Sequence, residues 1–111
     1  MMMGPIWSLD LTDQQRSQVN KISDELRRKN WELMGKMQDE SAKLRDLYSA
    51  DKLDRSAISA EYKHIFELRQ QRVEAMLDAQ AKIDGVLTAE QRNQLKQQRR
   101  RGPWWGAGDD D

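Results

Sequence analysis

Few side chains in this sequence are suited to covalent or metal chemistry. The chain holds no cysteine and a single histidine, His64. Because a structural metal site needs several converging ligands, we expect no metal and no cofactor here. The methionines at positions 1–3 and the aspartates at positions 109–111 offer soft and hard cation ligands at the two termini. There is no glycine-rich phosphate loop and no evident triad partner for His64. The sequence therefore predicts a protein that is not an enzyme and has no catalytic residue.

Apolar side chains beside the main helical stripes are better candidates, because they would bind a partner polypeptide. At about 100° per residue, Met34 lies roughly 60° and Trp31 roughly 120° from the apolar stripe of the first helical region. Phe66, Val73 and Leu77 form a second row beside the seam of a later helix. Methionine suits such contacts because its flexible thioether adapts to varied shapes. Two interpretations stay open: contact with a bound polypeptide, or closure of the helical bundle or of a dimer.

Two arginines, Arg69 and Arg72, fall in the middle of the apolar seam, where a heptad pattern expects aliphatic residues. A buried unpaired charge would be costly, so each guanidinium needs a partner or water. The arginines attract acidic or aromatic segments of a bound polypeptide, or pair with an acidic residue of a second subunit, or extend to solvent. The candidate set for polypeptide binding is Trp31, Met34, Met37, Phe66, Arg69, Arg72 and Val73.

The pattern Leu-Thr-x-x-Gln occurs twice, and each copy begins a helix-forming segment. The two copies are Leu11, Thr12 and Gln15, and Leu87, Thr88 and Gln91. In a capping box the threonine hydroxyl accepts the backbone N–H three residues on, and the glutamine side chain accepts the threonine N–H in return. We therefore expect each motif to cap the N-terminus of a helix.

Periodicity predicts an all-α fold, an extended, bent helical hairpin of three to four helices. A first helical region runs over about residues 13–48, and its apolar residues fall in one sector: Val19, Ile22, Leu26, Leu33, Met37 and Leu44. Gly35 and the polar segment after it could bend or split this region.

A turn at residues 49–54 leads to a long helix over about 55–86, capped by Asp54 or Ser56. Its seam residues alternate at steps of three and four: Ile58, Tyr62, Ile65, Met76, Ala79, Ile83 and Val86. A last helix runs from Thr88 to about residue 100. Residues 1–10 and 101–111 are expected to be flexible, which leaves residues 11–100 as the helical domain.

Composition restricts the partners of the chain. Charged residues make up 34% and hydrophobic residues 37%, and the mean hydropathy is -1.00. Such a chain is too polar for a thick core, so we expect narrow apolar stripes buried between two copies. The 19 basic and 19 acidic residues cancel, so no net field favours nucleic acid, and no apolar run is long enough to insert into a membrane. Residues 1–5 carry no signal-peptide pattern.

The two Leu-Thr-x-x-Gln motifs, together with the segment 68–91, make the chain resemble the Spy/CpxP family of periplasmic proteins over about residues 11–100. The resemblance implies an ATP-independent periplasmic chaperone that suppresses aggregation during envelope stress. It implies a cradle-shaped antiparallel homodimer whose concave face holds unfolded or partly folded client proteins. Other relatives imply two alternatives: a metal-responsive accessory protein for zinc or copper resistance, and a regulator that binds the periplasmic domain of an envelope-stress sensor kinase.

Overall fold

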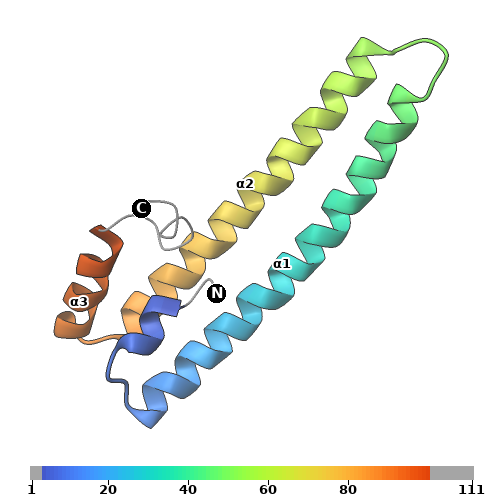
Figure 1. Cartoon of the computed structure of the whole chain (residues 1–111). Helices are drawn as coiled ribbons and strands as arrows, with labels where there is room; N and C mark the ends of the chain where they lie inside the picture. The colour runs from blue at the N-terminus through green and yellow to red at the C-terminus, as the bar shows by residue number, and fades with distance from the viewer. Residues whose placement is uncertain (1–3, 101–111) are drawn as a thin grey trace. The chain divides into compact units, whose positions relative to one another are not determined.

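The computed structural model describes residues 4–100, and every regular element in that range is helical (Figure 1). A short 3-10 helix, η1 (Gly4–Ser8), precedes three α-helices: α1 (Asp13–Tyr48), α2 (Arg55–Val86) and α3 (Ala89–Arg100). The predicted all-α fold class is confirmed. Within the described range, none of the helices combines the length and the apolar character that a membrane span requires.

Local capping sets the ends of the helices. The Asp54 carboxylate caps α2, because its Oδ1 accepts the backbone N–H of Ala57 at 3.1 Å. At the end of α1, the Ser49 hydroxyl donates to the carbonyl oxygen of Arg45 at 2.9 Å, which satisfies one of the carbonyls left open at a helix C-terminus. Gly35 does not split the first helical region, since α1 is a single helix of 36 residues.

The chain divides into two compact units. We call residues 25–78 the hairpin unit. In it, the segments of α1 and α2 run antiparallel side by side and are joined by the turn at residues 49–54 (Figure 1). Its core is a narrow stripe of buried side chains, Leu26, Leu33, Ile65 and Leu68. Other residues of the predicted stripes are only half-buried, among them Met37, Leu44, Ile58 and Met76.

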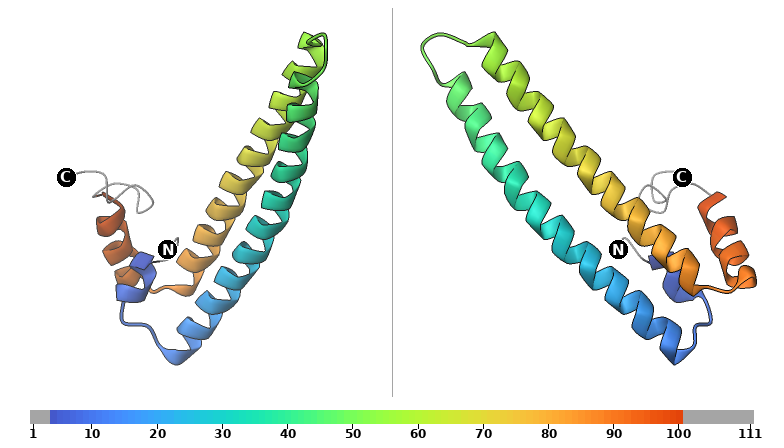
Figure 2. Two further views of the ribbon diagram at one scale, coloured as in Figure 1. Left: turned by 45° about the vertical axis from the view of Figure 1, so that its right-hand side comes forward. Right: turned by 180° about the vertical axis from the view of Figure 1, so that it is seen from behind.

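We call the described residues 4–24 and 79–100 the terminal unit. Here η1 lies against α3 (Figure 2), and the side-chain amide of Gln98 donates to the Ser8 hydroxyl at 2.9 Å. The buried side chains come from every element of the unit: Ile6, Leu9, Leu11, Val19, Ala79, Ile83, Leu87 and Leu95.

The N-terminal segment contributes to the core of the terminal unit. Within residues 1–10, which are expected to be flexible, residues 4–8 form η1, and both Ile6 and Leu9 are buried. The physical reason is long-range, because these side chains obtain apolar neighbours from helices near the other end of the sequence, and a short segment with a proline carries no periodicity of its own. The flexible tail expected over residues 101–111 lies outside the described residues.

Candidate functional site

Both Leu-Thr-x-x-Gln motifs form capping boxes in the terminal unit. The Thr12 N–H donates to Gln15 Oε1 at 2.9 Å, and the Gln15 N–H donates to Thr12 Oγ1 at 3.1 Å. Thr88 and Gln91 repeat this exchange at 2.9 and 3.2 Å. Two N–H groups that have no partner inside each helix are thereby satisfied.

The two motif glutamines also bind each other. The Gln15 amide donates to Gln91 Oε1 at 2.8 Å, and the Gln91 amide donates to Gln15 Oε1 at 3.3 Å. Each amide also donates to the carbonyl just before the other motif: Gln15 to Val86 at 3.2 Å, and Gln91 to Asp10 at 2.8 Å. Both side-chain oxygens and both NH₂ groups are therefore fully used. The repeated motif forms one reciprocal joint between the starts of α1 and α3, which is a structural role.

Exposed apolar side chains gather on one face of the hairpin unit. Phe66, Val73 and Leu77 fall within about 40° of one another on α2 at about 100° per residue, and all are exposed, Phe66 by 57% and Leu77 by 54%. The Tyr62 ring lies beside Phe66, with ring centroids 6.2 Å apart and the planes inclined by 32°. Tyr62 and Phe66 thus extend the row along the helix.

Tyr48 joins this row from α1. Its hydroxyl lies 3.1 Å from the Tyr62 hydroxyl, and either oxygen can be the donor. This hydrogen bond, with a smaller effect of desolvation, raises the pKa of Tyr48 above its ordinary value of 10.0. Met34 lies within about 40° of Tyr48 on α1, so it faces the same side. We call this surface the apolar face, made by Met34, Tyr48, Tyr62, Phe66, Val73 and Leu77.

The remaining candidate residues for polypeptide binding occupy different environments. Trp31 is 76% exposed and lies about 100° from Tyr48 around α1, so it is outside the apolar face. Met37 is half-buried in the packed stripe. Arg69 and Arg72 are exposed, and no ion pair joins either of them to another residue of the described range. Tyr62, which the heptad pattern assigns to the packed seam, is exposed instead, and the sequence analysis did not single out Tyr48. The contact between the two tyrosines depends on the register of the two helices.

The opposite face of the hairpin unit is polar and holds a depression of about 370 Å³. On α2, the lining residues lie about 100–200° around the helix from Phe66. The depression is lined by Lys36, Asp39, Glu40, Lys43, His64, Glu67, Leu68 and Gln71. The hairpin unit therefore presents one apolar and one polar surface on its two sides.

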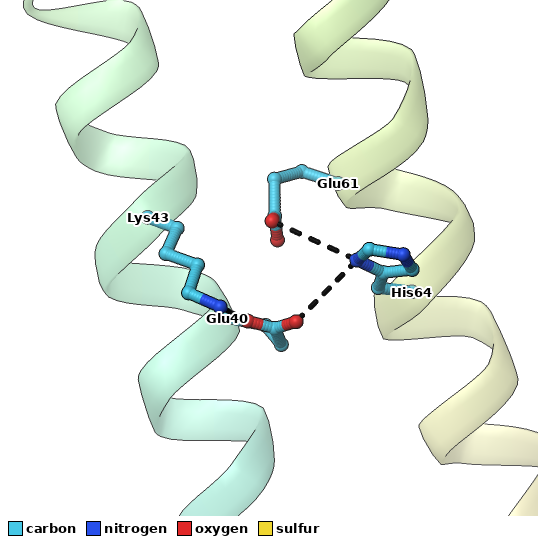
Figure 3. Close-up of polar contacts among 4 residues, drawn as sticks. All are labelled: Glu40, Lys43, Glu61 and His64. Atoms are coloured by element: carbon cyan, nitrogen blue, oxygen red, sulfur yellow. Dashed lines mark ion pairs between the residues drawn. The ribbon is translucent and has the colours of Figure 1, made fainter.

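A charged cluster at this depression joins α1 to α2 (Figure 3). His64 Nδ1 lies 3.4 Å from Glu40 Oε1 and 3.7 Å from Glu61 Oε1. Lys43 Nζ lies 2.9 Å from Glu40 Oε2, and this hydrogen bond raises the pKa of Lys43 above 10.5. The carboxylates of Glu40 and Glu61 both point toward the imidazole in Figure 3.

These three residues, Glu40, Glu61 and His64, are the ones in the described range whose ligand atoms could hold a metal ion. Sequence reasoning considered only His64 and missed the two carboxylates. The position of Glu61 could be predicted from the sequence, since Glu61 precedes His64 by three residues and so shares its side of α2. The approach of Glu40 from α1 could not be predicted, because periodicity within one helix does not determine its register against another helix.

A family model described as LTXXQ motif family protein matches residues 7–99 of the chain. The match spans both motifs and all of α1 and α2. No curated protein and no solved structure gave a match.

Proposed function

Because the chain belongs to the LTXXQ motif family, we propose that it is an ATP-independent chaperone that binds unfolded or partly folded proteins and suppresses their aggregation. The proposed location is the periplasm, and it is supported by the Spy/CpxP-like periplasmic proteins that the family includes. The protein needs no cofactor and no catalytic residue for this role, since the work is done by reversible binding.

The apolar face is the observation that carries this proposal. Aromatic side chains present about 150–250 Å² each, so the half-exposed residues of this face leave on the order of 500 Å² open to solvent. Soluble monomers seldom expose contiguous apolar patches larger than a few hundred Å² without a binding role. Arg69 borders Phe66 on α2 and adds a guanidinium that attracts acidic and aromatic segments.

The size of this surface fits weak binding that reverses without ATP. At about 25 cal/mol per Å², covering it contributes roughly 12 kcal/mol before costs. Association and ordering cost about 4–15 kcal/mol, so the net affinity is low and bound clients leave spontaneously. Chaperone cycles that hydrolyse ATP to break a tight complex are not required.

The proposal includes a homodimer. Two copies that cover part of their apolar faces would reduce the exposed area. The edges of the face, and Trp31, Arg69 and Arg72 outside it, would stay available to clients. The same surface would then stabilise the assembly and bind polypeptides.

A light-scattering assay with a denatured, aggregating test protein addresses the chaperone proposal. Without ATP and at an equimolar dose, the protein should suppress most of the scattering. Phe66→Asp places a carboxylate in the apolar face and should weaken protection several-fold, because covering that charge with a bound client costs free energy. Gln71→Asp puts the same charge on the polar face of the same helix and should leave protection unchanged.

Circular dichroism separates loss of binding from loss of folding, because both variants should keep the helical content of the wild type. Trp31→Ala should weaken protection in the same assay while leaving helicity intact. Unchanged aggregation of the test protein in the presence of the wild type would contradict the chaperone proposal and favour a regulator that binds a sensor kinase. Equal loss in Phe66→Asp and Gln71→Asp would show that the apolar face is not the client surface.

A further inference from the structure

We propose that Glu40, Glu61 and His64 form a binding site for a divalent transition-metal cation, and Zn²⁺ is the ion with which we test it. One imidazole nitrogen and two carboxylates supply the protein ligands, and water completes the coordination. The site lies in the hairpin unit on the polar face, away from the apolar face, and it does not depend on chaperone activity.

The spacing of the donor atoms fits a single ion. Zinc binds imidazole nitrogen and carboxylate oxygen at about 2.0–2.2 Å, so two ligands of a tetrahedral ion stand roughly 3.3 Å apart. His64 Nδ1 already lies 3.4 Å from Glu40 Oε1 and 3.7 Å from Glu61 Oε1, and one ligand atom from each residue lies within 4.8 Å of the others. Small side-chain rotations are enough to close the set.

Glu61 provides an independent observation. This residue is only 9% exposed, yet its Oε2 is buried with no hydrogen-bond partner among the described residues. A carboxylate oxygen withdrawn from water without a partner is unfavourable. Its other oxygen reaches His64 at 3.7 Å, which is beyond hydrogen-bond length. A cation bound by both oxygens of the Glu61 carboxylate, with Glu40 and His64 as its other protein ligands, would satisfy this orphaned oxygen.

The surrounding charges favour a doubly charged ion. Two carboxylates face one ammonium, that of Lys43, so the cluster keeps an excess negative charge when the imidazole is neutral. Lys43 binds Glu40 through Oε2 and leaves Oε1 directed at His64, so it orients the carboxylate for an ion, as neighbours of metal ligands commonly do.

The chemistry of the donors selects the class of metal. Imidazole suits zinc, copper and nickel, whereas calcium and magnesium prefer sets made of oxygen alone. The His64 side chain is 53% exposed and lines the polar depression. An ion held there keeps a coordination position open to water, and it can enter and leave through the depression.

Isothermal titration of the full chain with Zn²⁺ tests the site. We expect one ion per chain, and at least tenfold weaker binding in Glu61→Gln and in His64→Gln. The matched control is Glu32→Gln, which makes the same change at an exposed carboxylate of α1 paired with Lys36, and its affinity should stay within twofold of the wild type. Because His64 is exposed, its variant should keep the helical content, so it decides the question even if Glu61→Gln unfolds.

Nuclear magnetic resonance gives a direct readout of the ligand. His64 is the only histidine in the sequence, so the imidazole signals are unambiguous and should shift or broaden with one equivalent of Zn²⁺. Replacing Asp109, Asp110 and Asp111 together by asparagine should leave the affinity unchanged. The proposal is overturned by absence of binding, by an unshifted His64 signal at saturation, or by equal affinity in the wild type and His64→Gln.

Discussion

The Gln15 side chain takes part in four hydrogen bonds: with Thr12, Val86 and, in both directions, Gln91. Gln15→Ala removes the glutamine half of the α1 capping box, while Thr12 Oγ1 still accepts the backbone N–H of residue 15, and it leaves partners at the other motif unsatisfied. Loss of a hydrogen bond costs about 1 kcal/mol, and unsatisfied partly buried groups add about 1 kcal/mol or more. We expect the free energy of unfolding to fall by about 2–3 kcal/mol, measured by denaturant unfolding.

Gln14→Ala is the matched control, because Gln14 is exposed and precedes Gln15 in the same helix turn. Its effect should stay within about 0.5 kcal/mol. In a double-mutant cycle, Gln15→Ala and Gln91→Ala should together cost about 1 kcal/mol less than their sum, since each removes the same reciprocal pair. Strict additivity would show that the two motifs are independent caps.

A pH titration tests the contact between Tyr48 and Tyr62. The hydrogen bond raises the pKa of Tyr48 above 10.0, so the stabilisation is present at neutral pH and is lost as the pH rises through that raised pKa. Tyr62→Phe leaves Tyr48 as the only tyrosine, and its pKa should return toward 10.0. Phenolate absorbance measures the change. Identical midpoints for the wild type and the variant would contradict the contact.

Residue-level chemistry was predictable from the sequence only where it is local. The capping role of Thr12 and Gln15 follows from a spacing of three residues. The pairing of Gln15 with Gln91 and the approach of Glu40 to His64 join residues far apart in the sequence, and both depend on how helices pack. No periodicity within one helix specifies that register, so the sequence predicted the two capping boxes but neither the glutamine pair nor the cluster of Glu40, Glu61 and His64.

At the scale of an element, Gly35 makes α1 less stable than it needs to be. A Cβ added at this position meets nothing within 4 Å, and the residue lies inside a continuous helix. Gly35→Ala reduces the conformational freedom of the unfolded chain without a steric cost. It should raise the free energy of unfolding by about 0.5–1 kcal/mol, measured by denaturant unfolding.

A substitution that introduces a glycine elsewhere in the same helix provides a comparison. Ser41→Gly, at another exposed position of α1, should lower the free energy of unfolding by about 0.5 kcal/mol. A loss of stability in Gly35→Ala would contradict the open surroundings of this glycine. It would indicate that another chain approaches α1 there.

Helices were predictable because their signals are repeated along many residues. The sequence predicted helices over 13–48 and 55–86, and the structure has them at Asp13–Tyr48 and Arg55–Val86. Asp54 and the two threonine caps supplied the boundaries. The 3-10 helix η1 was not predicted, because its burial depends on α3 and because a segment of five residues is too short to show a hydrophobic periodicity.

At the scale of the whole molecule, the hairpin unit buries few large side chains for its length. Its buried aliphatic residues are Leu26, Leu33, Ile65 and Leu68, while the apolar face remains open. A stripe this narrow contributes little stability to one chain. Pairing of two apolar faces would add burial of a similar kind, and this is the physical reason to expect a dimer.

Sedimentation equilibrium tests this expectation, because association linked to folding makes stability depend on concentration. The wild type should sediment as two copies at micromolar concentration, and its melting temperature should rise with protein concentration. Phe66→Asp should shift the equilibrium toward one copy, since two carboxylates would face each other in an apolar contact, whereas Gln71→Asp should not. A monomer at all concentrations that binds no hydrophobic dye would mean that the apolar face is covered within one chain, and the client surface proposed for it would then be lost as well.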